Sequence, residues 1–255
     1  MVKDAIGIID LGLDGIEVAE TLTQNLKHER IIYITDLQYD SYLNISEKEI
    51  AEILKRNIEI IAEYNPKLLI IVNDIIVDRA ASVILDLKVP SVNVIETLIE
   101  YANKYYQDKN MVLLVKEKIL EANLFPKNLK YNRLYQIASD ELEVIIKEGM
   151  TKTSRSFNTV LEKLKPVLKK QIDLIITGTP NLLELNIEFK EYLNFQEITA
   201  HGEIFLKRLL EANITDLNRK GRGGFFVFGN MTKKEFLKKQ KITSKFKYQQ
   251  IQFKE

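Results

Sequence analysis

Leu68-Leu69-Ile70-Ile71-Val72-Asn73-Asp74 is the stretch that decides the fold. A continuous apolar run that stops at two polar residues is typical of a buried parallel strand whose carboxyl end opens into a site. The stretch Leu174-Ile175-Ile176-Thr177-Gly178-Thr179-Pro180-Asn181 repeats this pattern later in the chain. Ligands of such sheets bind beyond the carboxyl ends of the strands. The two stretches therefore predict two related α/β halves, with candidate sites at residues 72–74 and 179–181.

The composition is that of an ordinary globular protein. The 255 residues, 45% of them hydrophobic, are enough for one large domain or two small ones. The formal net charge is +1, from 37 basic and 36 acidic residues, which argues against an obligate nucleic-acid or membrane-surface protein. There is no cysteine, so disulfides, thiolate metal sites and cysteine nucleophiles are excluded.

The first residues and the apolar runs of the sequence indicate the cellular compartment in which the protein is expected. Residues 1–4 lead directly into an expected strand, without the apolar region and small-residue cleavage site of a signal peptide. No apolar run approaches the roughly 18 residues that a membrane helix needs. We therefore expect a cytoplasmic protein with no membrane partner.

Strands and helices are expected to alternate along the chain. In the first 95 residues the patterns predict strands at 5–9, 30–35, 68–74 and 89–95, and helices at 16–26, 46–65 and 76–87. Further on they predict helices at 97–106, 116–124, 140–148, 151–170, 187–193 and 201–212, with strands at 111–115, 131–137, 174–177 and 197–199. A last strand at 225–228 and a helix at 233–240 follow a glycine-rich loop at 221–224.

Several short motifs occur in the order and spacing of one known family. Residues 6–15 are similar to its opening IGxFDSGxGG motif, and residues 71–74 fall on its ACNT motif. Residues 173–181 fall on DxLxLGCTHYP, and further matches are 33–43 on YxGDxxxxPYG, 89–96 on PVIGVxEP, 145–149 on LVEEG and 228–230 on TGD. Through these motifs the chain resembles glutamate racemase, the cofactor-independent enzyme of the aspartate/glutamate racemase family, over residues 6–230.

The resemblance implies a fold and an assembly. It implies two similar parallel-sheet α/β domains with a cleft between them, the first formed by residues 1–95 with 205–255 and the second by residues 96–204. It also implies a homodimer that uses no cofactor and no metal ion.

The departures from the family motifs concentrate on the chemistry. In the family, two cysteines on opposite faces of the substrate remove and return the α-proton, and Val72 and Thr179 take their positions here. Valine has no titratable group, and a threonine hydroxyl is too weak a base to take an α-proton without activation. Asn181 replaces the histidine beside the second cysteine. We therefore expect no catalytic residue of the two-cysteine kind, and no racemisation by that route.

Other substitutions change the polar residues of the implied pocket. Leu11 replaces a serine, and Asp74 replaces a threonine at a place where a carboxylate would repel the substrate carboxylate. Four residues of the family motifs remain, and they support the fold more than the activity: Asp10, Gly12, Asn73 and Gly178. Together with Asp74 and His201 they form the candidate ligand-binding set.

Two hypotheses about function rest on this set. The first is a catalytically inactive glutamate racemase-like protein, retained for binding, assembly or regulation with an unidentified protein partner. The second is an isomerase or other enzyme whose site is rebuilt from Asp10, Asp74, Thr179 and His201. His201 is either a proton carrier or a capping group at a helix start. Asp10, Asp36 and Asp74 are either a divalent-cation site or strand-end caps in water.

A third hypothesis concerns the carboxy-terminal segment. Residues 219–255 contain 11 basic and 2 acidic residues, interleaved with the aromatic residues Phe236, Phe246, Tyr248 and Phe253. Such a segment can meet nucleic acid or an acidic protein surface. Because some members of the resembled family bind DNA gyrase, the protein is also considered as a regulator of a DNA-handling partner. The composition also fits a solvated, partly disordered tail, and this is the alternative that we expect.

Overall fold

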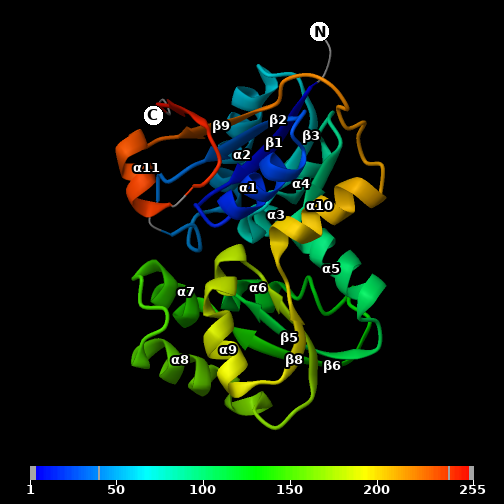
Figure 1. Ribbon diagram of the computed structural model, residues 1–255, viewed down its shortest axis with the longest axis vertical. Helices are drawn as coiled ribbons and strands as arrows, with labels where there is room; N and C mark the ends of the chain where they lie inside the picture. The colour runs from blue at the N-terminus through cyan, green and yellow to red at the C-terminus, as the bar shows by residue number, and fades with distance from the viewer. Residues whose placement is uncertain (1–3, 40, 241, 253–255) are drawn as a thin grey trace. The chain divides into compact units, whose positions relative to one another are not determined.

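The computed structural model of the protein describes residues 4–39, 41–240 and 242–252. The chain divides into two compact units, Met1–Val94 with Phe205–Glu255, and Ile95–Ile204. Two helices carry the chain from one unit to the other, α5 (Val94–Tyr105) and α10 (His201–Glu211) (Figure 1). No helix in the described part is both long enough and apolar enough to cross a lipid bilayer.

The first unit alternates strands with helices. Its elements before the crossing are β1 (Ala5–Asp10), α1 (Ile16–Asn25), β2 (Arg30–Thr35), α2 (Glu47–Ala62), β3 (Pro66–Ile71), α3 (Asp74–Arg79), α4 (Ala81–Leu85) and β4 (Ser91–Asn93). Its elements after the return are β9 (Gly224–Gly229), α11 (Lys233–Lys239) and β10 (Lys247–Gln250). The strands form one sheet in the order β10-β9-β2-β1-β3-β4, and every pair in it is parallel.

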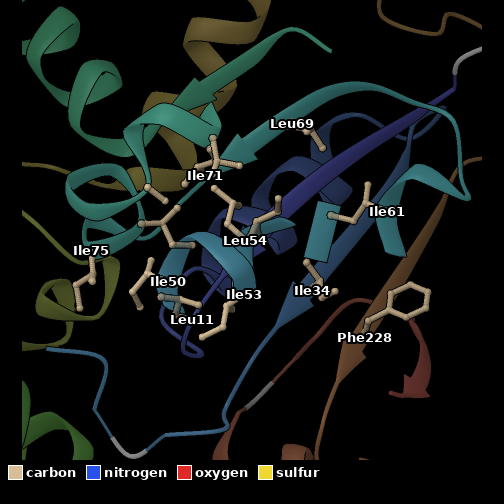
Figure 2. Close-up of a cluster of buried hydrophobic side chains, with 14 of the residues drawn as sticks. Leu11, Ile34, Ile50, Ile53, Leu54, Ile61, Leu69, Ile71, Ile75 and Phe228 are labelled. Atoms are coloured by element: carbon tan, nitrogen blue, oxygen red, sulfur yellow. The ribbon is translucent and has the colours of Figure 1, made fainter. Parts of the chain in front are cut away.

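Burial on both faces explains the apolar runs of the central strands. All six residues of β1 and of β3 are buried, as expected for a parallel sheet covered by helices on both sides. Alternate residues point to opposite faces. On one face Ile9, Ile34 and Ile71 pack with residues of α2, and Figure 2 shows Ile50, Ile53 and Leu54 of that helix against them.

The second unit repeats this arrangement on a smaller scale. Its elements are β5 (Lys109–Val115), α6 (Glu117–Ala122), β6 (Tyr131–Ala138), α7 (Asp140–Lys147), α8 (Ser154–Leu164), the 3-10 helix η1 (Lys165–Val167), β7 (Ile172–Thr177), the 3-10 helix η2 (Pro180–Leu185), α9 (Asn186–Tyr192) and β8 (Phe195–Ile198). The strand order is β6-β5-β7-β8, again with every pair parallel. The prediction of two parallel-sheet α/β domains is therefore confirmed.

Several expected elements differ in extent. Val94 and Ile95 begin α5 and do not extend the preceding strand, and the helix expected at 76–87 is broken at Ala80 into α3 and α4. The helix expected at 151–170 is shorter, because Thr153 caps its start and Pro166 falls in the 3-10 turn that follows Leu164. The segment between the strand expected at 174–177 and the helix expected at 187–193 contains the 3-10 helix η2.

The prediction of a partly disordered tail is wrong for the described residues up to 252. Lys247–Gln250 form β10, which pairs with β9 in parallel register. Phe236 packs on Phe246 and Tyr248, with ring centroids 6.0 and 5.3 Å apart. The pattern did not reveal this strand, because its four residues are polar and lie at the edge of the sheet. Phe253 lies outside the described residues.

Candidate functional site

Asp10 is at the centre of a hydrogen-bond network beyond the end of β1. Its Oδ1 accepts from the Gly12 amide at 3.0 Å and from Asn73 Nδ2 at 3.3 Å. Its Oδ2 accepts from the Gly15 amide at 2.8 Å and from the Tyr33 hydroxyl at 2.9 Å. The side chain is 1% exposed. Four donors fix the buried carboxylate in place, so Asp10 acts as a structural acceptor and is not positioned as a proton carrier.

The same network occupies the place where an external anion would bind. Gly15 is the N-cap of α1, and its amide together with that of Gly12 would offer donors to a ligand anion. Both amides donate to Asp10. Burial, together with the charge and hydrogen bond of Asp10, raises the pKa of Tyr33 well above its usual value, which keeps the hydroxyl protonated as a donor.

Val72, in the position of the first family cysteine, packs on the turn that Asp10 holds. The valine follows β3, is 3% exposed, and its amide donates to the Ile9 carbonyl at 3.1 Å. A Cβ placed on residue 15 would lie 2.2 Å from Val72 Cγ2, so only glycine fits there. The apolar side chain thus takes up the space over the glycine turn.

Leu11 belongs to the hydrophobic core. It is 2% exposed and packs in the cluster that includes Ile50 and Ile53 (Figure 2). This explains the leucine at a position where the resembled motif has a serine. The side chain contributes to the core and offers no donor to a ligand.

Asn73 and Asp74 begin α3. The Asn73 Oδ1 accepts from the amides of Ile75 and Ile76 at 3.1 and 3.3 Å, which makes it an N-cap. Asp74 is the first residue of the helix and is 1% exposed. An acidic residue at this position is favourable to a helix. Of the predicted ligand-binding residues, Asp10, Gly12 and Asn73 are therefore brought together by hydrogen bonds, and each has a structural role.

Asp36, the third carboxylate of the cation hypothesis, makes its hydrogen bonds and its ion pair with other residues. Its Oδ1 accepts from the Gln38 amide at 2.9 Å and from the Tyr42 hydroxyl at 3.0 Å, and its Oδ2 pairs with Arg56. Within the described residues no group of three or more histidine, aspartate or glutamate side chains is arranged to hold a metal ion.

In the second unit, Gly178, Thr179 and Asn181 follow β7. The Gly178 amide donates to the Leu114 carbonyl at 2.7 Å, which extends the pairing of β7 with β5 by one residue. The Thr179 hydroxyl donates to Asn181 Oδ1 at 2.7 Å and lies 3.4 Å from Glu143 Oε1. Thr179 is 4% exposed. Its hydroxyl is thus engaged with the amide oxygen of Asn181 and lies near the carboxylate of Glu143.

Three polar residues that the sequence did not single out join Thr179. Glu143 on α7 accepts from the Ser139 hydroxyl at 2.8 Å, and its Oε2 lies 3.5 Å from Lys116 Nζ. Lys116 and Ser139 directly follow β5 and β6, so this group spans the carboxyl ends of three neighbouring strands. The available signal was a polar residue after each expected strand, with Glu143 one helical turn beyond Ser139. We call Lys116, Ser139, Glu143, Thr179 and Asn181 the second-unit polar group.

His201 is buried beside the end of β7. It is 1% exposed, and its Nε2 lies 2.8 Å from the Thr177 carbonyl and 3.1 Å from the Thr177 hydroxyl. Nδ1 is buried without a hydrogen-bond partner among the described residues. Burial lowers the pKa of His201 to about 4, although the Thr177 carbonyl opposes the shift. The ring is therefore neutral at pH 7, with Nε2 donating to the carbonyl.

This geometry sets what each group of residues can do. The end of β1 and β3 presents a satisfied carboxylate, a valine and a helix cap, and no group poised to take a proton. The second-unit polar group brings a cation, a carboxylate and two buried hydroxyls together at the carboxyl ends of three strands.

Comparison with known proteins gives the family context. No family model matches the chain. The chain is 24% identical over 245 residues to a glutamate racemase of Thermoanaerobacter sp., covering 91% of this chain and 90% of that protein. It is 22% identical over 199 residues to the glutamate racemase of Lactobacillus acidophilus, covering 76% and 74%.

Solved structures show the same fold. A glutamate racemase isoform of Bacillus anthracis superposes with a TM-score of 0.81 at 20% identity, over 98% of this chain and 97% of that one. The glutamate racemase of Thermus thermophilus, solved with β-chloro-D-alanine, has the same score at 16% identity and the same coverage. The resemblance found in the motifs is therefore confirmed: the chain is similar to glutamate racemases in sequence and shares their fold.

Proposed function

We propose that this protein does not racemise glutamate and is retained for binding, assembly or regulation. One observation carries the proposal: the strand-end residues in the positions of the family thiols are Val72, packed over Gly15, and Thr179, whose hydroxyl donates to Asn181. Removal and return of an α-proton needs a base on one side and an acid on the other. Neither residue supplies one.

The test is exchange of the α-proton of L-glutamate and of D-glutamate in deuterated water, followed by proton NMR. A cysteine-containing glutamate racemase serves as the positive control. We expect no exchange above the rate in buffer alone, at a protein concentration at which the control enzyme exchanges the α-proton completely. Exchange of either enantiomer that depends on the protein would reject the proposal.

A second function, a rebuilt enzyme site, is favoured by the second-unit polar group. Lys116 pairs with Glu143 at the carboxyl ends of parallel strands, where ligands of such sheets bind. The Asp10 and His201 parts of that hypothesis are weaker, because Asp10 accepts four hydrogen bonds and His201 is neutral and buried.

Thermal-shift titration with amino acids and dicarboxylic acids separates the two functions. A site at this group predicts a shift that disappears in Lys116→Gln and persists in the exposed control Lys127→Gln. No shift with any compound would leave the retained-scaffold function as the better supported one. The homodimer implied by the resemblance stays part of the proposal, and light scattering that shows only monomer at micromolar concentration would reject it.

A further inference from the structure

Positive charge is segregated in the first unit. Residues 219–255 hold 11 of the 37 lysine and arginine residues but only 2 of the 36 aspartate and glutamate residues. The segment belongs to the folded sheet, because it supplies β9, α11 and β10. Lys233, Lys234, Lys238 and Lys239 are therefore carried by α11 and Lys247 by β10, and a solvated random tail does not account for them.

Strand register brings these residues to one end of the sheet. Gly224 lies beside Arg30, and Lys247 lies beside Phe226, so the amino ends of β2, β9 and β10 are neighbours. The contact between Phe225 and Phe246, with centroids 6.0 Å apart, continues the same register. Helix α11 follows β9 and precedes β10 in the chain, and its Phe236 packs on Phe246, the residue before β10.

The loop before β9 adds more basic residues at this end. A Cβ on residue 223 would lie 2.4 Å from the Lys27 carbonyl, so the glycine lets the loop pass directly against the turn before β2. The Gly221 carbonyl lies 2.8 Å from His28 Nδ1. We name the resulting set of exposed residues the basic edge: Lys27, Arg219, Lys220, Arg222, Lys238, Lys239, Lys245 and Lys247.

The carboxylates near the basic edge are already engaged. Glu29 is buried and pairs with Lys67 at 2.8 Å. Glu20 accepts from the backbone amides of Thr243 and Ser244 at 2.7 and 2.9 Å. In the part of the chain that the structure describes, none of the eight residues of the basic edge is ion-paired. Glu235 interacts electrostatically with Lys238 and Lys239 without an ion pair, and Lys247 Nζ lies 5.5 Å from the centre of the Phe226 ring, so these exposed cations remain accessible to a partner.

The partner chemistry follows from the form of the surface. Single cations spread over three adjacent strands, about 4.8 Å apart, match a line of phosphates better than one small anion. Insertion into a lipid surface needs several apolar side chains, and Leu237 is the one large apolar side chain of residues 219–252 that is markedly exposed. The rings of Phe236, Phe246 and Tyr248 pack on one another, so they are not offered for base stacking.

We propose that the basic edge binds the phosphate backbone of nucleic acid, without reading base sequence. The surface lies where the strands begin, whereas Asp10 and Val72 lie at the other end of the sheet, where the strands finish. It is therefore independent of the proposed loss of racemase chemistry, and each proposal can fail without the other.

The experiment measures fluorescence anisotropy of a labelled 20-base-pair duplex at several salt concentrations. The test variant combines Lys238→Gln, Lys239→Gln, Lys245→Gln and Lys247→Gln. The control variant removes the same charge from exposed lysines of the second unit, by Lys127→Gln, Lys130→Gln, Lys169→Gln and Lys170→Gln. Circular dichroism and the melting temperature check that both variants are folded.

We expect the wild-type protein to bind with a Kd of roughly 10⁻⁴ to 10⁻⁶ M, as for sequence-independent binding. Loss of four phosphate contacts should weaken binding at 50 mM salt by about tenfold or more and reduce the slope of log K against log salt by about 3 to 4. The control variant should keep most of the affinity and the slope. A scrambled duplex should bind equally well.

Three results would overturn the proposal. The first is no binding of the wild-type protein at 50 mM salt. The second is an equal loss in both variants, which would reduce the effect to net charge. The third is binding of poly-L-glutamate or of phosphatidylserine vesicles at least as tight as that of the duplex at equal salt, which would assign the surface to an acidic polypeptide or to a membrane.

Discussion

His201 makes the stability of this protein depend on pH in a way that one substitution should remove. Its pKa is lowered to about 4 from 6.5, because the ring is buried and Nδ1 would carry a proton with no acceptor among the described residues. Above pH 6.5 the ring is neutral in both the folded and the unfolded chain, so it contributes no slope. Between pH 6.5 and 4 the unfolded chain binds a proton that the folded chain does not, and the free energy of unfolding falls as pH falls.

The size of the effect follows from the two pKa values. A difference of about 2.5 units corresponds to roughly 3 kcal/mol over the whole window, and to about 2 kcal/mol between pH 7 and pH 5. Below pH 4 both states are charged, and the contribution is constant. This loss adds to that of any carboxylate that titrates in the same range, so it must be isolated as a difference between proteins.

The assay is urea unfolding followed by circular dichroism at pH 7, 6 and 5, for the wild-type protein, His201→Gln and His28→Gln. Glutamine keeps an amide donor for the Thr177 carbonyl and cannot titrate. His201→Gln should lower stability by some constant amount yet lose about 2 kcal/mol less than the wild-type protein between pH 7 and pH 5. His28 is exposed and is the only other histidine, so His28→Gln serves as the control for replacing an imidazole by an amide. Parallel pH profiles for wild type and His201→Gln would refute the reasoning.

Three further changes probe the first unit and the proposed absence of racemase chemistry. Asn57→Leu should stabilise the protein by about 1–3 kcal/mol, measured as a higher urea midpoint, because both amide atoms of this fully buried side chain are without partners in the described residues. Asp10→Asn should destabilise it by about 1–3 kcal/mol in the same assay, since an amide nitrogen would face backbone and hydroxyl donors, and an unchanged midpoint would contradict the structural role. Val72→Cys with Thr179→Cys should produce no measurable α-proton exchange of glutamate, because Leu11 belongs to the core and supplies no donor, and a lost donor of this kind costs about a hundredfold or more. Exchange clearly above the parent protein would show that the rest of the pocket is intact.

The sequence predicted what depends on long apolar patterns. Six-residue apolar runs such as those around Ile8 and Ile70 predicted buried parallel strands, and the helix that starts at Ser46 follows from its cap and its apolar stripe. β10 was missed because its stability comes from pairing with β9 and from aromatic contacts between distant residues. Such tertiary contacts leave no local periodicity.

The sequence named candidate residues at the strand ends but could not assign their roles. The motifs placed Asp10 and Asn73 after two different strands, and the structure joins them by a hydrogen bond because these adjacent parallel strands end at the same side of the sheet. They could not show that four donors fill the Asp10 carboxylate, or that His201 lies inside the unit. Glu143 was missed because it is one acidic residue among several on an ordinary amphipathic helix. Its role arises only when strand order brings Lys116 and Thr179 beside it.

The match to the family motifs at Asp10, Gly15 and Asn73 has a physical cause. Gly15 admits no side chain because Val72 fills the space above it, and Asp10 holds the amides of that same turn. Asn73 caps α3 while it donates to Asp10, so loss of either residue would leave buried polar groups unpaired. A thiol at position 72 carries no such constraint, since a valine of similar size packs in its place at little cost. Residues that the backbone needs are therefore evidence for the fold before they are evidence for the reaction.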